Sequence, residues 1–151
     1  MAGLRDYLLT HIPLTAAMGV EVLVERPERV VLTAPLAPNV NHQRTAFGGS
    51  VAALATLAAW SLIRVRLDKA GRAANVVIQR SSMEYRAAID GELTAVCEFG
   101  DEDLWRNAIE RLDRHRRTRL DLHSHLEHAG KAAARFCGTF VLLDERERGS
   151  P

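Results

Sequence analysis

This sequence has little of several features that would assign a protein to a specialised class. It contains two cysteines, Cys97 and Cys137, at a spacing that fits no zinc motif, so we expect buried free thiols rather than disulfides or a metal site. Aromatic residues make up 5% of the chain and the net charge is +1, which gives no basis for a nucleic-acid surface. The N-terminal residues lack the basic, apolar and small-residue pattern of a signal peptide, so the expected compartment is the cytoplasm.

Length and composition are those of one globular domain with a substantial core. The chain has 151 residues, of which 47% are hydrophobic and 26% are charged. It contains no internal repeats or low-complexity segments. We expect a single domain over residues 1–143, followed by a charged tail, residues 144–151, that is expected to be disordered.

Residues 39–63 stand out from the rest of the chain. They begin as a polar loop that ends in Gly48 and Gly49, and they continue as an apolar run, residues 51–63, interrupted only by one threonine and one serine. The run is too long for an ordinary strand and is rich in Ala and Leu, so it predicts a helix that is buried on most sides. At 1.5 Å per residue it would span roughly 20 Å, short of a bilayer core, so we expect a core helix rather than a membrane span.

The rest of the chain predicts strands and two further helices around this central helix. The expected order is a helix at 2–10, strands at 19–25 and 29–34, the central helix at 49–67, strands at 75–86 and 92–99, a helix at 103–114, and strands at 117–127 and 132–143. In the first strand Val20, Val22 and Val24 are expected to share one face. The connections are too short for parallel crossovers, so the fold class is α+β: an antiparallel six-stranded sheet wrapped around a long buried central helix, with a covering helix between the fourth and fifth strands.

The start of the central helix is the first candidate site. Gly48 and Gly49 carry no side chain, so a ligand can approach their backbone closely. The first N–H groups of a helix have no internal partner and lie at the positive end of its dipole. A carbonyl that gains negative charge would be stabilised there, as in an oxyanion hole. The same residues also fit a plain Gly-Gly turn into a buried helix, with Ser50 as a cap.

Several short segments, taken together, resemble a known family. In the N-terminal half they are Ile12-Pro13-Leu14 with Ala17-Met18-Gly19-Val20, Ala34-Pro35-Leu36-Ala37-Pro38-Asn39 with Asn41, and Thr45-Ala46-Phe47-Gly48-Gly49-Ser50. In the C-terminal half they are Trp105, residues 116–122, residues 134–136 and residues 138–141. The element order resembles the hot-dog fold of thioesterases and dehydratases. The segments are similar to those of the YiiD C-terminal, thioesterase-like family over nearly the whole chain.

This resemblance implies an acyl-thioester site and an oligomer. The substrate would be carried on coenzyme A or on acyl carrier protein. Its coenzyme A or phosphopantetheine group would belong to the substrate, so no separate cofactor is expected. The sites would lie between the subunits of a homodimer or a dimer of dimers.

Ten residues in and around the central stretch form the candidate site. The candidate catalytic residues are Asn39, Asn41, Thr45 and Gly49, with Gly49 as the main oxyanion donor and the others orienting water or binding the thioester. The candidate substrate-binding residues are Phe47, Gly48, Ser50, Thr56, Trp60 and Glu84. Phe47 and Trp60 are expected to line an acyl tunnel or the core. Asparagine near a turn is also a common backbone cap, which is the alternative role for Asn39 and Asn41.

One position departs from the hydrolytic pattern of the wider fold. Thioesterases of the His-Gly-Gly type carry an aspartate or glutamate about two turns into the helix, where this sequence has Thr56, and Phe47 stands in place of the histidine. Threonine does not readily act as a base or a nucleophile at neutral pH. His42 and Glu84 are the remaining candidates for a base, although a loop histidine and a glutamate in an alternating strand are also typical of solvent-facing residues.

Three functions therefore remain open on the sequence alone. The first is hydrolysis of an acyl thioester by a thioesterase-like enzyme. The second is decarboxylation of a malonyl thioester in fatty-acid initiation, in which an enolate develops on the thioester oxygen and bond breaking requires no base. The third is non-catalytic binding of an acyl thioester.

Basic residues at 64–72 and 114–119 bear on the choice of partner. They can meet the phosphates of coenzyme A or the acidic surface of a carrier protein, and they also fit the solvated ends of helices and strands. Neither nucleic acid nor a membrane is expected as a partner. His123, His125 and His128 are expected on a solvent face rather than in a metal site.

Overall fold

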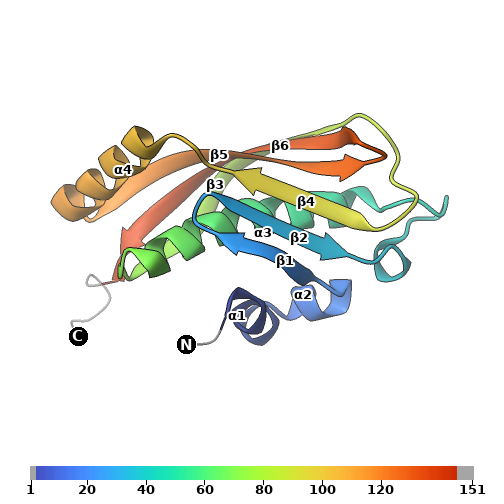
Figure 1. Cartoon of the computed structure of the whole chain (residues 1–151), viewed down its shortest axis with the longest axis horizontal. Coiled ribbons are helices and arrows are strands. Elements are labelled where there is room, and N and C mark those ends of the chain that lie inside the picture. Colours follow the sequence, from blue (N-terminus) through green and yellow to red (C-terminus); the bar gives the residue numbers. More distant parts are fainter. Residues whose placement is uncertain (1–2, 146–151) are drawn as a thin grey trace.

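Helix α3, Gly48–Lys69, is the centre of the fold, and a single antiparallel sheet packs on it (Figure 1). The computed structural model describes residues 3–145. The sheet has six strands in the order β1-β2-β4-β5-β6-β3, so the predicted strands and the α+β class are confirmed. The other elements are α1 (Leu4–His11), α2 (Pro13–Met18), β1 (Glu21–Arg26), β2 (Arg29–Ala34), the 3-10 helix η1 (Ala37–Asn39), β3 (Ala74–Tyr85), β4 (Leu93–Glu98), α4 (Glu102–His115), β5 (Arg117–His128) and β6 (Lys131–Asp144).

The burial of α3 is that of a core helix. Its buried residues include Ala55, Ala58 and Ala59, whose small side chains let the strands lie close to the helix. Its 22 residues span about 33 Å, so the length expected from the apolar run alone was too short. By length and composition α3 would suit a membrane, but 56% of its most apolar window is buried inside the domain. One side of α3, along Ala53, Thr56, Leu57 and Trp60, is only half-buried.

Two pairs of consecutive strands form hairpins, whereas the consecutive strands β3 and β4 are separated in the sheet. β1 and β2 form a hairpin through Pro27-Glu28, and β5 and β6 form one through Ala129-Gly130, whose two residues have positive φ. β3 and β4 are also consecutive, with Asp90-Gly91 in the loop between them. They are not neighbours in the sheet, because β4 pairs with β2 and β5 whereas β3 pairs with β6. β3 is therefore an edge strand, at the opposite side of the sheet from β1.

The first strand differs from its predicted alternation. A β-bulge lies between Val22 and Val24, so that Val22 is opposite Leu32 and Val24 is opposite Val31. Leu32 belongs to the core, and its neighbour Val31 points to the other face of the sheet. The prediction that Val22 and Val24 share a face was wrong, because the extra residue of a bulge reverses the alternation.

The N-terminal segment contains two short helices where one was predicted. Pro13 ends α1 at His11, as expected, but it also begins α2. Proline suits the first position of a helix, because the helix does not use the N–H group that proline lacks. The two helices lie beside β1 (Figure 1).

The domain boundary at residue 143 and the disordered tail at 144–151 stay predictions. β6 continues to Asp144, which pairs with Ala74 of β3. Residues 146–151 lie outside the part of the chain that the structure describes.

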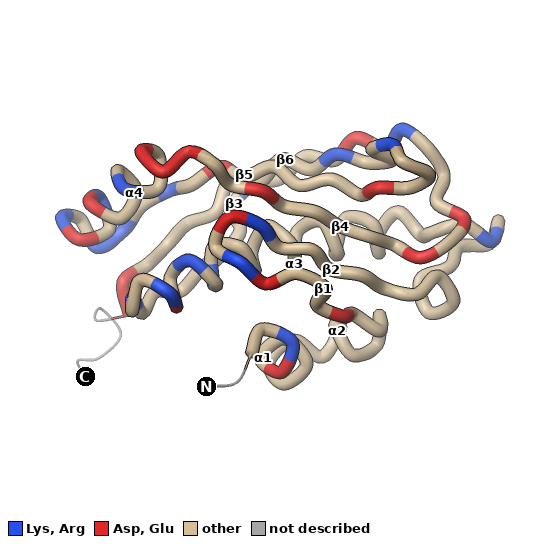
Figure 2. The backbone as a smooth tube through the Cα atoms, viewed as in Figure 1, with Lys and Arg blue, Asp and Glu red and all other residues tan. Residues whose placement is uncertain are grey.

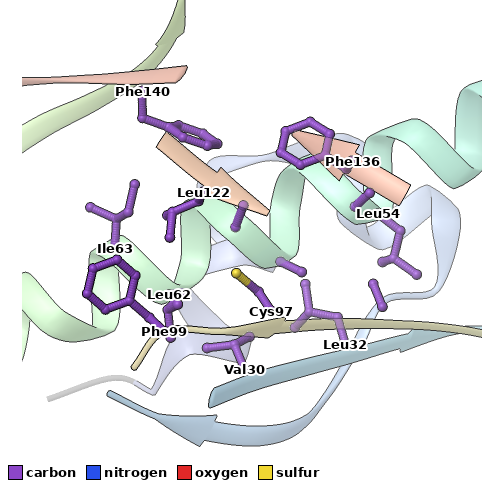
Figure 3. Close-up of a cluster of buried hydrophobic side chains, with 14 of the residues drawn as sticks. Val30, Leu32, Leu54, Leu62, Ile63, Cys97, Phe99, Leu122, Phe136 and Phe140 are labelled. Atoms are coloured by element: carbon purple, nitrogen blue, oxygen red, sulfur yellow. The ribbon is translucent and has the colours of Figure 1, made fainter. Parts of the chain in front are cut away.

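Inward-facing side chains of the sheet and of α3 form a continuous apolar core (Figure 3). Phe136 and Phe140 of β6 and Leu54 of α3 belong to it, and Cys97 projects into it from β4. Burial raises the pKa of the Cys97 thiol to about 12, so this thiol is unreactive at neutral pH. Both cysteines are free thiols, as expected, but only Cys97 is buried, whereas Cys137 is half-buried.

A buried arginine fastens α4 to α3. Arg66 is 6% exposed and donates a hydrogen bond of 2.6 Å from Nη2 to Oε1 of Glu102. Its guanidinium carbon lies 4.5 Å from the ring centroid of Phe99 and 5.2 Å from that of Trp105. The sequence suggested that Arg66 could belong to a basic surface patch. The structure shows that Arg66 is buried and is not part of such a patch. Basic and acidic positions are interspersed along α4 and the C-terminal half of α3 (Figure 2).

Acid should weaken the ion pair between Arg66 and Glu102. The hydrogen bond from Arg66 lowers the pKa of Glu102 from its ordinary value of 4.5. A carboxylate whose pKa is lowered by folding stabilises the fold above its unfolded pKa, and this contribution is lost as the pH falls through the folded pKa. We expect Glu102→Gln to lower the free energy of unfolding at neutral pH and to match the wild type in acid, measured by urea unfolding over a range of pH. A difference that stays constant into acid would contradict a role for the carboxylate charge.

Candidate functional site

The first backbone N–H groups of α3 are unpaired. Phe47 precedes the helix without a side-chain cap, and the first helical hydrogen bond runs from the Val51 N–H to the Phe47 carbonyl at 3.0 Å. The N–H groups of Gly48, Gly49 and Ser50 make no hydrogen bond within residues 3–145. Gly49 is exposed, whereas Gly48 and Ser50 are half-buried. This arrangement provides the donors and the positive dipole end that an oxyanion requires.

Packing also accounts for Gly49, but not for Gly48. A Cβ atom on Gly49 would collide with the ring of Phe47, which lies over the start of the helix and is 56% exposed. A Cβ atom on Gly48 would lie 3.6 Å from the ring of Tyr85, an ordinary contact. The Tyr85 hydroxyl donates a hydrogen bond of 3.2 Å to the Gly48 carbonyl. Tyr85 was not among the predicted site residues; it lies two residues after Met83 on the face of β3 that the register against β6 turns toward the helix.

Asn39 holds the base of the loop. Its side chain is 2% exposed, and Nδ2 donates to the carbonyls of Met18 at 2.9 Å and Pro35 at 2.8 Å. Its backbone carbonyl accepts a hydrogen bond of 2.7 Å from the Phe47 N–H. Both contacts of the side chain use the Asn39 amide N–H donors inside the fold, as expected of a residue that positions the loop. The catalytic assignment of Asn39 stays a prediction.

Asn41 organises the turn that follows. Its Oδ1 accepts hydrogen bonds from the N–H groups of Gln43 at 2.8 Å and Thr45 at 3.1 Å. Its Nδ2 donates to the Thr45 hydroxyl at 2.8 Å and to the Ala46 carbonyl at 3.4 Å. The side chain thus closes an Asx-type turn. His42 is exposed in this turn and makes no hydrogen bond with the described residues.

Substitutions of Asn41 distinguish two roles for its side chain: holding the turn, or donating a hydrogen bond directly to the transition state. Because its amide is already engaged, we expect Asn41→Ala to lower kcat/KM for a thioester through loss of the turn, and Asn41→Asp to restore most of it by keeping the Oδ1 acceptor. Gln43→Ala, in the same turn, is the matched control and should behave like the wild type. A loss of about 10²-fold in both Asn41 variants would instead identify the amide N–H as a transition-state donor.

Two cavities of about 300 Å³ each lie beside the part of α3 from Gly48 to Trp60. The first, which we call the glycine cavity, is at the start of the helix between Gly48, Val51 and Tyr85. The second, the tryptophan cavity, follows the half-buried side of α3 past Thr56 to Trp60. Three of the predicted site residues line these cavities: Gly48 lines the glycine cavity, and Thr56 and Trp60 line the tryptophan cavity.

Glu84 is not brought together with these residues. It pairs with Arg135, whereas its neighbour Met83 pairs with the core residue Phe136. Glu84 therefore points to the outer face of the sheet, where its carboxylate accepts a hydrogen bond of 3.0 Å from Arg86. Its predicted role in substrate binding gains no support from this placement.

No metal centre is evident among residues 3–145, where no group of three or more histidine, cysteine, aspartate or glutamate side chains is placed to hold an ion. Thr56 occupies the position at which a catalytic carboxylate was considered. Its hydroxyl donates a hydrogen bond of 2.7 Å to the Ala52 carbonyl one turn earlier in α3. The described site is thus a set of unpaired backbone donors at the start of α3, with no carboxylate at position 56.

Comparison with known proteins identifies the family. A family model described as "Putative thioesterase (yiiD_Cterm)" matches residues 1–144. The chain belongs to this family. This YiiD C-terminal thioesterase family member is similar to a protein of unknown function from Chlorobaculum tepidum, with 28% identity, a TM-score of 0.89, and coverage of 93% of this chain and 92% of the other.

Two further structures extend the similarity of this YiiD C-terminal family member. A "putative thioesterase" from Shewanella oneidensis is 25% identical, with a TM-score of 0.83 and coverage of 92% of this chain and 94% of the other. A thioesterase from Haemophilus influenzae is 13% identical, with a TM-score of 0.74 and coverage of 99% and 96%, and it supports the fold alone. The predicted family and the hot-dog fold are confirmed.

Proposed function

We propose that this chain hydrolyses an acyl thioester carried on coenzyme A or acyl carrier protein. The observation that carries the proposal is the set of N–H groups on Gly48, Gly49 and Ser50, which make no hydrogen bond with the described residues and lie at the positive end of a buried 22-residue helix. Cavities beside and beyond these donors provide room for the two ends of a thioester. Membership of a thioesterase family supports the same reaction class.

The reaction would proceed through a tetrahedral intermediate. Water attacks the thioester carbonyl carbon, and the carbonyl oxygen takes up the negative charge beside the Gly49 N–H. The intermediate then breaks its carbon–sulfur bond and releases the free thiol and the free acid. His42, exposed in the loop before the helix, is the candidate acceptor of the proton from water.

Decarboxylation of a malonyl thioester is the second candidate. The observation that favours it is Thr56, which replaces the carboxylate of the hydrolytic pattern and whose hydroxyl is engaged within the helix. In this reaction the bond between the malonyl carboxyl carbon and C2 breaks, carbon dioxide leaves, and the enolate oxygen is stabilised by the same N–H groups. Water then protonates C2 to give the acetyl thioester. No base is required for the bond-breaking step.

The proposed working form is a cytoplasmic homodimer, or a dimer of dimers, that includes pairing of β3 with β3 of a second copy. β3 is a 12-residue edge strand with one partner strand in this chain, and Val77 and Ile78 on it are 49% and 41% exposed. Such an edge presents unpaired backbone groups to a second strand. Dimerisation would also cover the exposed side of the tryptophan cavity, which Ile78 lines.

Mass spectrometry of thioesters incubated with the purified protein tests the proposal. The substrates are malonyl and medium-chain acyl groups on coenzyme A and on carrier protein, with a Gly49→Pro variant as the background. Release of free thiol and free acid by the wild type alone would support hydrolysis. Conversion of malonyl to acetyl thioester, with the thioester intact, would support decarboxylation instead. No change in any substrate would contradict both reactions and leave non-catalytic binding.

A further inference from the structure

We propose that the Tyr85 hydroxyl makes the Gly49 N–H a stronger and better-oriented donor, by binding the carbonyl of the peptide group to which that N–H belongs. This inference rests on the proposed function, since it assigns a further residue to the same site. In this role Tyr85 touches neither the thioester nor the attacking water. It is a positioning residue that acts through the backbone at the start of α3.

One hydrogen bond joins Tyr85 of β3 to the first peptide group inside α3. The hydroxyl donates to the Gly48 carbonyl oxygen at 3.2 Å. The Gly48 carbonyl and the Gly49 N–H are the two ends of one planar peptide group. The Gly49 N–H makes no hydrogen bond with the described residues. Tyr85 therefore binds one end of the amide group whose other end is the proposed oxyanion donor.

A hydrogen bond to a carbonyl oxygen increases the donor strength of the same amide. It draws electron density toward the oxygen, which raises the double-bond character of the C–N bond and the positive charge on the N–H group. Linked hydrogen bonds strengthen one another in this way by about 10–30% per bond. A carbonyl oxygen has two lone pairs, so Tyr85 can donate to Gly48 in addition to the helical bond. The hydroxyl, the peptide group and a developing oxyanion would form one such chain.

The same hydrogen bond limits movement of the peptide group. Gly48 and Gly49 lack side chains, so steric contacts restrict the peptide group between them less than in an ordinary helix. A second hydrogen bond, of 2.8 Å from the Ala46 N–H to the Ile89 carbonyl, ties the preceding loop to the segment that follows β3. Tyr85 and Ile89 thus hold the start of α3 and the loop before it. A donor that is oriented before the substrate binds is what stabilisation of an oxyanion requires.

The register of β3 places Tyr85 beside the donors and leaves its hydroxyl replaceable. Tyr85 pairs with the core residue Ala134 of β6, and both residues line the glycine cavity together with Gly48. Tyr85 is 55% exposed. Tyr85→Phe therefore removes the hydroxyl without leaving a buried polar side chain unpaired, and the variant should fold like the wild type.

The test is a double-mutant cycle between Tyr85→Phe and Gly49→Pro, measured as single-turnover rates of a thioester with the protein in excess. In the wild-type background Tyr85→Phe should lower the maximal rate about 5-fold, the size expected for one hydrogen bond. It should leave the half-saturating concentration unchanged, because the oxyanion develops only in the transition state. In the Gly49→Pro background, which lacks the N–H, Tyr85→Phe should cause no further loss. Tyr7→Phe, at the other tyrosine of the chain, is the matched control and should have no effect.

Two kinetic results would overturn the inference. A loss by the same factor in both backgrounds would show that Tyr85 acts independently of the Gly49 N–H, as in a direct contact with the substrate. Unchanged turnover in Tyr85→Phe would show that its hydrogen bond to Gly48 does not affect the donor.

Nuclear magnetic resonance distinguishes failure of this inference from failure of the proposed function. In Tyr85→Phe the carbonyl carbon of Gly48 and the amide proton of Gly49 lose polarisation, so both resonances should move upfield. Phenylalanine keeps the aromatic ring, so the change reports the hydroxyl, and Tyr7→Phe should leave both resonances in place. Movement of both in a protein that turns over no thioester would overturn the proposed reaction and support the coupling of Tyr85 to Gly49. Resonances that stay in place would overturn the coupling, whatever the turnover.

Discussion

A Gly49→Pro variant should fold and lose about 10²–10³-fold in thioester turnover, because it removes one N–H donor at the start of α3. Gly49 is the second residue of the helix, and its N–H makes no helical hydrogen bond. Proline is tolerated in the first turn of a helix for that reason. Release of thiol, measured beside far-ultraviolet circular dichroism, separates loss of the donor from loss of the fold.

The matched control for this variant is Gly49→Ala. An alanine keeps the N–H group, but its Cβ displaces the ring of Phe47, as a proline would. The alanine variant should therefore show the effect of moving Phe47 without loss of the donor. Equal turnover by the folded proline and alanine variants would show that Gly49 makes room for Phe47 and does not stabilise an oxyanion.

Replacing Arg66 by alanine should produce the largest loss of stability among single changes between α3 and α4, about 3 kcal/mol in the free energy of unfolding. The substitution empties the space that the buried side chain fills and removes its contacts with the rings of Phe99 and Trp105. The carboxylate of Glu102 is not stranded by the change, because its side chain is 63% exposed. Urea unfolding at neutral pH measures the effect.

Arg66→Met is the control for the charge of this residue. Methionine retains most of the length of the side chain and none of its charge. Replacement of a buried ion pair by an apolar side chain of similar volume is often close to neutral, so Arg66→Met should lose much less stability than Arg66→Ala. If both variants lose the same amount, the ion pair rather than the packing holds α4 to α3.

Local pattern was sufficient for most of the secondary structure. The apolar run at 51–63 identified α3, and alternation identified the strands to within a few residues of their observed ends. Alternation failed where one extra residue was inserted, at the bulge after Val22. The role of Pro13 was also ambiguous. Local sequence predicts that a helix stops before Pro13, but it does not predict that a second helix begins there.

The candidate site was partly predictable. The Gly-Gly start of a buried helix is a local feature, and its free donors follow from helix geometry alone. The partners of Asn39 were not predictable, because Met18 is 21 residues earlier in the chain. Glu84 and Tyr85 are adjacent in sequence, yet one points away from the helix and the other contacts Gly48. Which of them faces the site depends on the register of β3 against β6.

The sequence by itself determined the α+β class, the buried central helix and its exposed amide groups, because helical and strand periodicity and helix ends are local properties of the backbone. Only the tertiary structure decided the strand order, the burial of Arg66 and the packing of Trp60 against Tyr7 and β3. These features depend on contacts between residues far apart in the chain. Burial of apolar surface is favourable whatever the sequence separation of the residues that come into contact. A short sequence pattern therefore does not predict such contacts.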